Sequence, residues 1–200
     1  MNSMRQKGAL VFFLSLFLLC ASNTYANEGK RGGFRLVEKT FGTGYGFGDI
    51  KPPQDDYSSL LFYVRFGFRL NDCWGFPNHR GELQFAVEPL FNHLLQPNSG
   101  ILVGVGLGFY YWYPLGQHLS WYSEVNVAPH YLSIDTIEQA DAGFNFLDVV
   151  GTGLRWHFAD NKTINLGYRL RHISDANISD GPNSGIDTHS VVLSVTFISK

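Results

Sequence analysis

The chain has 200 residues, of which 16% are charged and 16% aromatic, and its formal net charge is −2 at pH 7. This weakly acidic balance gives no support for nucleic-acid binding, and the length fits a single domain. Mean hydropathy is −0.07 despite the many aromatic residues, which is expected when polar and apolar residues alternate along strands instead of gathering in blocks.

The N-terminal segment has the pattern of a secretory signal peptide. Arg5 and Lys7 precede an apolar run over residues 9–19, and small residues near Ala26 predict cleavage after it. The apolar run is shorter than the roughly 20 residues that a membrane-spanning helix needs. We therefore expect residues 1–26 to be removed on export. A lipoprotein attached through Cys20 is the alternative, although Leu precedes that cysteine where Gly or Ala is usual.

Residues 27–200 are expected to form one exported domain. Loss of Arg5 and Lys7 leaves 13 basic against 17 acidic residues, so the formal charge falls to about −4. Cys20 would also be removed, which leaves Cys73 as the single cysteine. One cysteine cannot form an intramolecular disulfide, and stability must come from the architecture of the fold.

Eight segments alternate between polar and apolar residues with the period of a β-strand. They span about residues 33–44, 59–70, 82–95, 100–113, 119–132, 144–158, 163–174 and 187–197. In the fourth segment, for example, Ile101, Val103 and Val105 alternate with glycines. The segments have about 11 to 15 residues, longer than the usual 5 or 6 of globular sheets and long enough to cross a bilayer at a tilt.

One face of these segments is bulky and apolar, and the other carries glycines and polar residues, namely Glu88, Glu124, Asn126, Arg155, Asn165, Arg169 and Arg171. Such a polar face is typical of the filled interior of a small barrel. Aromatic residues at strand ends, in residues 110–113 and at Trp121, Tyr122 and Trp156, fit interfacial girdles. The sequence predicts an all-β fold, an eight-stranded antiparallel transmembrane β-barrel of the outer membrane. A soluble eight-stranded barrel that holds a ligand is the alternative.

Chain topology predicts which end of the barrel faces outward. Both termini of bacterial outer-membrane barrels normally lie in the periplasm, which places the connection between the last two strands outside the cell. Short turns at residues 114–118 and 159–162 fit the periplasmic side. Two connections disagree with this pattern, because residues 71–81 form a long periplasmic turn and residues 96–99 a short outer one.

A base and a hydroxyl share the apolar face near the end of the seventh segment. His172 and Ser174 have the same parity as Leu170, so they should lie side by side on the lipid side of the wall. Asp187 begins the next strand with outward parity. A nucleophile, a base and an orienting acid are the three parts of a serine esterase. Polar residues at a membrane interface are the plain alternative, because His-x-Ser alone is a weak motif.

His172, Ser174 and Asp187 belong to two longer segments that together resemble a known family signature. Residues 168–176, YRLRHISDA, and residues 181–187, GPNSGID, resemble the C-terminal signature of the lipid A deacylase (PagL) family, a His-x-Ser-Asn-Ala segment before an Asn-x-Gly-Ile-Glu-like segment. The resemblance implies an outer-membrane barrel that hydrolyses the ester-linked 3-hydroxyacyl chain at the 3-position of lipid A, without a metal or other cofactor. It also implies Ser174 as nucleophile, His172 as base and Asp187 as acid.

Two departures from the family pattern affect the site. Asp187 stands where the family commonly has Glu, with one extra residue in the preceding turn, and Asp175 stands where it has Asn. A carboxylate at position 175 would repel an oxyanion. Asn183 and backbone N–H groups near Ala176 are therefore the better candidates for the oxyanion hole, and the alternative for Asn183 is a role in the turn alone.

The expected partners follow from the same resemblance. They are lipid A or lipopolysaccharide as substrate and the surrounding outer-membrane lipids, with a homodimer as an open possibility and no nucleic acid. The remaining histidines lack metal-ligand spacing, although His189 has the outward parity needed to compete for Asp187. Asp148 also has outward parity, which predicts a bulge or a misplaced strand there. The alternative function is a non-catalytic barrel with a structural or binding role.

Overall fold

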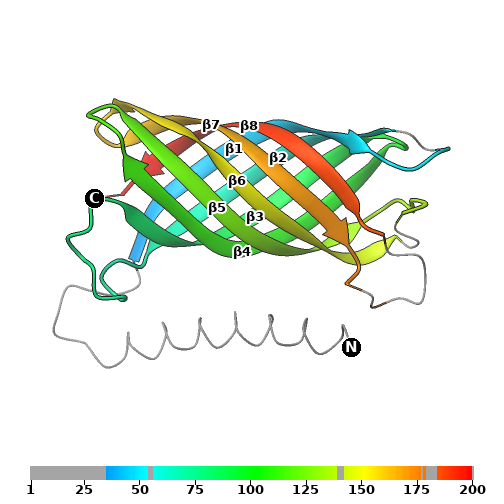
Figure 1. Cartoon of the computed structure of the whole chain (residues 1–200), viewed down its shortest axis with the longest axis horizontal. Helices are drawn as coiled ribbons and strands as arrows, with labels where there is room; N and C mark the ends of the chain where they lie inside the picture. The colour runs from blue at the N-terminus through cyan, green and yellow to red at the C-terminus, as the bar shows by residue number, and fades with distance from the viewer. Residues whose placement is uncertain (1–34, 54–55, 139–141, 177, 179–183, 200) are drawn as a thin grey trace.

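The computed structural model describes residues 35–53, 56–138, 142–176, 178 and 184–199, and these form a closed antiparallel barrel (Figure 1). Its strands are β1 (Arg35–Asp49), β2 (Asp56–Arg69), β3 (Glu82–Gln96), β4 (Gly100–Pro114), β5 (Leu119–Leu132), β6 (Gly143–Ala159), β7 (Lys162–Ser174) and β8 (Ile186–Ile198). In this described part, no helix has the length and apolar character needed to cross a membrane. The predicted signal peptide, residues 1–26, lies outside the described residues.

The barrel closes because each strand pairs with its neighbour in sequence and β1 pairs with β8. Figure 1 shows that β1 begins and β8 ends at the same end of the barrel, the end expected in the periplasm. Apolar side chains cover the outer wall, as on β4, where Ile101, Val103, Val105 and Leu107 are 38–44% exposed. A closed ladder with an apolar exterior is the architecture of a transmembrane barrel, and the predicted fold class is confirmed.

The first strand is longer than its sequence predicts. The sequence predicts an end at Gly44, whereas β1 continues to Asp49. Gly44 and Gly48 face neighbouring backbone. A Cβ at Gly44 would lie 2.5 Å from the Val191 carbonyl oxygen, and one at Gly48 would lie 2.5 Å from the Asp187 carbonyl oxygen. Glycine here permits close strand contact inside the barrel, and does not end the strand.

Ion pairs fill the middle of the interior. Arg65 donates to Glu88 at 2.8 Å and to Glu124 at 2.5 Å, and Arg169 donates to the same two carboxylates at 2.8–3.0 Å. The four residues come from β2, β3, β5 and β7, and each is at most 7% exposed. The Tyr63 ring lies 4.3 Å from the Arg169 guanidinium. This network joins strands that are not neighbours, so it cross-links the barrel through its centre.

A second buried pair lies nearer the expected periplasmic end. Arg155 donates to both oxygens of Glu38, at 2.8 and 2.7 Å, in a bidentate pair. Tyr110 and Tyr122 lie inside the barrel beside it, with their rings stacked 5.0 Å apart and 2–3% exposed. Their expected place in the interfacial girdle was therefore wrong. Strand parity turns them inward, where the Tyr110 ring lies 4.7 Å from the Arg65 guanidinium and 5.5 Å from that of Arg155.

Glu38→Gln should destabilise the barrel strongly. The Arg155 guanidinium would keep its charge in a buried site without a carboxylate, and losing one partner of a buried pair costs about 3–5 kcal/mol. Urea denaturation of the folded barrel in detergent micelles measures this loss of unfolding free energy.

The matched control is Asp72→Asn. Asp72 lies 3.8 Å from Arg69, and both side chains are 28% exposed, so its loss should cost less than about 1 kcal/mol. Equal losses in the two variants would contradict a stabilising role for the buried pair.

Candidate active site

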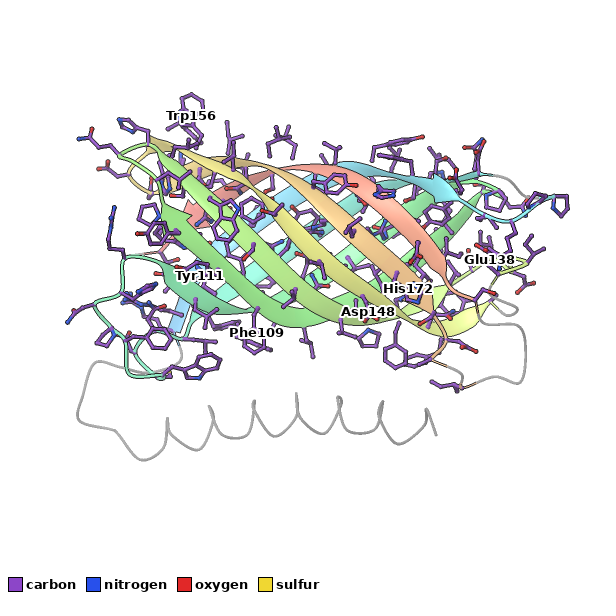
Figure 2. All side chains as sticks on the ribbon, in the orientation of Figure 1. Phe109, Tyr111, Glu138, Asp148, Trp156 and His172 are labelled. Carbon is purple, nitrogen blue, oxygen red and sulfur yellow. The ribbon has the colours of Figure 1, made fainter. Side chains whose placement is uncertain are left out.

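The predicted base and nucleophile lie at the end of β7, at the end of the barrel opposite to the start of β1 and the end of β8 (Figure 2). They continue an outward row in which Leu166, Tyr168 and Leu170 are 57%, 41% and 49% exposed. The side chain of His172 is 41% exposed, and Ser174 is half-buried. The two residues therefore share the outer face of the wall, next to the apolar band.

Asp187 is the direct cross-strand partner of His172. The Nδ1 atom of His172 lies 2.6 Å from Oδ1 of Asp187, and the Asp187 side chain is 88% exposed. A carboxylate at this position selects the tautomer with a proton on Nδ1, which leaves Nε2 as the basic atom. The shorter acid reaches the imidazole because the β7–β8 register places the two residues directly opposite each other.

Ser174 lies two residues beyond His172 on the same face. Its cross-strand partner on β6 is Phe146, whose ring makes an edge contact with Phe144 at 5.1 Å. Among the described residues, no hydrogen bond joins Ser174 to His172. The fold thus brings His172 and Asp187 into direct contact and places Ser174 on the same surface. The catalytic roles assigned to the three residues stay predictions.

Asp148 faces outward next to His172, contrary to the expected bulge or misplaced strand. It is the cross-strand partner of His172 on β6, and the β6–β7 register is regular from Phe146 to His157. The side chain is exposed. A carboxylate at this position on the lipid side is tolerated because it lies near the end of the barrel beside a titratable imidazole. His172 is therefore flanked by one acid on each neighbouring strand, which the order of residues along the chain did not reveal.

Gly185 packs against the imidazole ring. Its φ is +76°, in the left-handed region that favours glycine, and a Cβ there would lie 2.3 Å from Cε1 and 2.7 Å from Nε2 of His172. The absence of a Cβ on the glycine before β8 therefore leaves room for the edge of the imidazole that carries Cε1 and Nε2. Sequence reasoning used this glycine only as part of a motif.

The oxyanion-hole candidates are only partly described. Ala176 has a φ of 57° directly after the strand, which turns the chain away from β7. Asp175 is buried, at 7% exposure, and its carbonyl oxygen accepts a hydrogen bond from the N–H of Ile178 at 3.2 Å. Ser174 is more exposed than Asp175. Asn183 lies outside the described residues, so its expected role stays a prediction.

His189 does not compete for Asp187. Its Nδ1 atom is hydrogen-bonded to the Tyr168 hydroxyl, and its ring stacks on Phe47 with centroids 5.7 Å apart. Asp187 is thereby left to His172. Within the described ranges of the chain, no group of three or more His, Cys, Asp or Glu residues could hold a metal ion.

Three outer connections meet beside the site. Lys51 lies 3.4 Å from a carboxylate oxygen of Glu138 and donates to the Ser184 hydroxyl at 3.2 Å. The N–H of Ser184 donates to the Glu138 carbonyl oxygen at 2.9 Å. These contacts hold the start of β8, with Gly185 and Asp187, against the connections after β1 and β5.

Comparison with known proteins gives one family and several structures. The model of the family described as lipid A 3-O-deacylase (PagL) matches residues 60–196, more than half of the chain. The crystal structure of the outer membrane enzyme PagL is similar, with a TM-score of 0.55 and 15% identity over 79% of this chain and 98% of that one. Neisserial surface protein A has a TM-score of 0.59 and 15% identity over 81% and 96%. No curated protein matches.

Gly185→Ala should displace the His172 ring, because the new methyl group cannot occupy the position of the imidazole. The His172 side-chain resonances in NMR spectra, or a crystal structure, would show the broken Nδ1–Asp187 contact. Gly75→Ala is the matched control, because Gly75 has a similar φ of +82° but nothing within 4 Å of its Cβ position. Both variants should lose about 1–2 kcal/mol to backbone strain. An unchanged imidazole in Gly185→Ala would contradict this packing.

Proposed function

The chain belongs to the lipid A 3-O-deacylase (PagL) family, and we propose that it is an outer-membrane serine esterase that removes the ester-linked 3-hydroxyacyl chain from the 3-position of lipid A. The observation that supports this most directly is the 2.6 Å contact between His172 and Asp187 on the same outer face as Ser174. Nucleophile, base and acid on one surface are the minimum for acyl transfer to a serine.

The proposed reaction has two steps. Ser174 Oγ attacks the ester carbonyl carbon while Nε2 of His172 takes the hydroxyl proton, and Asp187 stabilises the imidazolium through Nδ1. The tetrahedral intermediate then collapses, the bond to the sugar oxygen breaks, and His172 returns the proton to that oxygen. A water activated by His172 hydrolyses the acyl-serine, which releases a 3-hydroxy fatty acid and regenerates the serine.

The negative charge of the tetrahedral intermediate needs donors close to Ser174. We propose backbone N–H groups near Ala176, together with Asn183, because Ala176, with a left-handed φ of 57°, lies two residues after Ser174. Two carboxylates, Asp148 and Asp187, are the cross-strand partners of His172 on β6 and β8. Burial of Asp175 supports a role for this carboxylate away from the developing oxyanion.

Access to the site suits a substrate that is already in the membrane. Leu170 and Phe144 on neighbouring strands are 49% and 57% exposed on the outer wall, so they can contact the acyl chain. Lipid A in the outer leaflet reaches Ser174 by lateral diffusion, with its acyl chain in the hydrocarbon region and its sugar at the interface. The apolar outer surface thus supplies substrate binding without an enclosed pocket.

Ser174→Ala should abolish deacylation. The full chain is expressed in cells whose lipid A carries the 3-linked hydroxyacyl group, and mass spectrometry of the extracted lipid A measures its loss. Removal of the nucleophile from a triad lowers the rate by about 10³-fold or more. Ser123→Ala is the control, since Ser123 pairs with Tyr111 and Thr152 near the opposite end of the wall, and it should retain activity.

Two outcomes would count against the proposal. Deacylation that persists in Ser174→Ala would exclude this serine as the nucleophile. Folded wild-type chain that leaves susceptible lipid A unchanged would favour the alternative of a non-catalytic barrel.

Asp187→Asn should reduce activity more than Asp148→Asn. The first change removes a charge-assisted hydrogen bond to Nδ1, worth about 1.5–3 kcal/mol or roughly 10- to 100-fold in rate. The second removes an exposed charge that makes no hydrogen bond to His172, and less than about fivefold is expected. Initial rates of deacylation of lipid A in mixed micelles measure the loss of activity in both variants. A larger loss in Asp148→Asn would assign the orienting role to β6.

A further inference from the structure

The turn between β2 and β3 is longer than the other connections at the expected periplasmic end of the barrel. It spans residues 70–81, whereas the connections after β4 and β6 span residues 115–118 and 160–161. The Asn71 side chain is buried and donates to the Gly81 carbonyl oxygen at 2.9 Å, which holds the two ends of the turn together. The chain therefore builds an ordered feature here that closure of the barrel does not require.

The β2–β3 turn packs on the outer wall. The Trp74 ring lies 6.0 Å from that of Phe109, an outward-facing residue of β4. The His79 ring lies 6.2 Å from that of Tyr111 on the same strand, and Nε2 of His79 is 3.1 Å from the Tyr111 hydroxyl. Figure 2 shows Phe109 and Tyr111 on the wall toward this end of the barrel. These contacts fix the turn on the lipid-facing side of the wall.

Two aromatic side chains of the turn remain uncovered. Trp74 is 40% exposed and Phe76 is 37% exposed, and their rings make an edge contact with centroids 6.4 Å apart. Aromatic residues at the ends of a transmembrane barrel lie at the level of the lipid headgroups and of the adjacent part of the acyl chains. Trp74 and Phe76 therefore extend the apolar wall at the level of the periplasmic leaflet.

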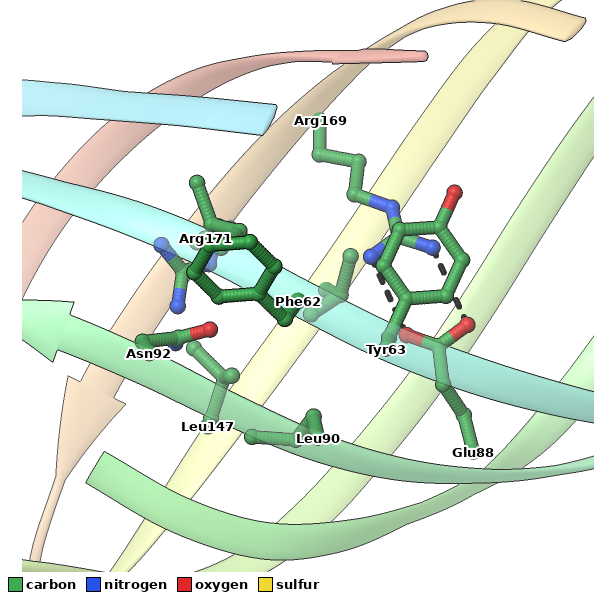
Figure 3. Close-up of a pocket in the computed structure, with 10 residues that line it drawn as sticks. Phe62, Tyr63, Glu88, Leu90, Asn92, Leu147, Arg169 and Arg171 are labelled. Atoms are coloured by element: carbon green, nitrogen blue, oxygen red, sulfur yellow. Dashed lines mark hydrogen bonds and ion pairs between the residues drawn. The ribbon is translucent and has the colours of Figure 1, made fainter. Parts of the chain in front are cut away.

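Arg80 brings a positive charge to the same surface. Its guanidinium lies 5.4 Å from the centroid of the Tyr113 ring on β4, and the residue is exposed. The interior of the barrel gives a contrast, because the guanidinium of Arg169 is bonded to Glu88 there (Figure 3). Among the residues that the structure describes, no carboxylate forms an ion pair with Arg80. Its donors can therefore serve an anionic ligand, and a guanidinium can bind a phosphate through two parallel hydrogen bonds.

The carboxylates next to Arg80 in the chain are engaged elsewhere. Asp72 and Glu82 lie 3.8 and 3.9 Å from Nε of Arg69, and Nη2 of Arg69 donates to the Pro77 carbonyl oxygen at 3.1 Å. The ammonium of a zwitterionic headgroup would need a free carboxylate at this surface. A headgroup such as that of phosphatidylglycerol carries one phosphodiester charge and a neutral glycerol. Charge complementarity therefore favours an anionic phospholipid.

We propose that the β2–β3 turn and the adjacent wall of β4 bind one anionic glycerophospholipid of the periplasmic leaflet, with the chemistry of phosphatidylglycerol. Arg80 binds the phosphodiester, and Trp74, Phe76 and Phe109 contact the part of an acyl chain next to the headgroup. The surface lies at the end of the barrel opposite to His172, so the proposal is independent of the proposed deacylase activity.

Native mass spectrometry tests this lipid site. The folded chain is released from detergent micelles that contain equal amounts of phosphatidylglycerol and phosphatidylethanolamine with the same acyl chains, and the bound lipid is identified by its mass. We expect one phosphatidylglycerol per chain, retained about tenfold more often than phosphatidylethanolamine, because one charge-assisted contact distinguishes the two lipids. Arg80→Gln should reduce this preference to about onefold.

Lys162→Gln is the matched control. Lys162 lies in the connection at the same end of the barrel, and its ammonium is 5.8 Å from the Phe197 ring, but it is not part of the β2–β3 turn. Arg80 and Lys162 are both exposed, so both variants should fold, and Lys162→Gln should keep the preference. Equal retention of the two lipids by the wild-type chain, or an unchanged preference in Arg80→Gln, would overturn the proposal. Loss of the preference in Lys162→Gln as well would also overturn it, because general charge attraction would then explain the binding.

Discussion

The structure depends on the requirement that backbone N–H and C=O groups inside a bilayer be hydrogen-bonded within the protein. Eight strands meet this requirement only when the last pairs with the first, and the β1–β8 ladder does so. Closure leaves every strand with one face toward lipid and one toward the interior. The two-residue period then decides the surroundings of each side chain, and it places His172 on the outside and Arg171, its neighbour in sequence, on the inside.

The interior of this barrel is polar and still tightly filled. Carboxylates from β3 and β5 are shared by arginines from β2 and β7, so each ion is desolvated but is also hydrogen-bonded to ions of the opposite charge. Pairing of this quality is what makes buried charge tolerable. The rigid cross-links also support the wall behind the site, because Arg169 lies three residues before His172 on the strand that carries both.

The site is formed by the surface of the wall and by the chain that enters β8. Its acid, Asp187, and the glycine that packs on the imidazole, Gly185, come from one short segment, and Lys51 and Glu138 hold the start of that segment. An exposed site of this kind suits a substrate that shares the membrane. The structural similarity to Neisserial surface protein A as well as to PagL shows the barrel fold alone, and the proposed activity rests on the few residues at the outer end of the barrel.

Local sequence was sufficient to predict the strands, the closed barrel and the shared face of His172 and Ser174. The alternation of polar and apolar residues that these predictions use lies within each strand. Local sequence failed at the end of β1, which continues past Gly44 to Asp49, and at Tyr110 and Tyr122, where aromatic character suggested the interface. The tertiary structure alone decided which residues face each other across strands. Asp187 and Asp148 flank His172 because of register. Register is set by turns and by barrel closure, and a slip of one residue would turn a whole strand to the other face.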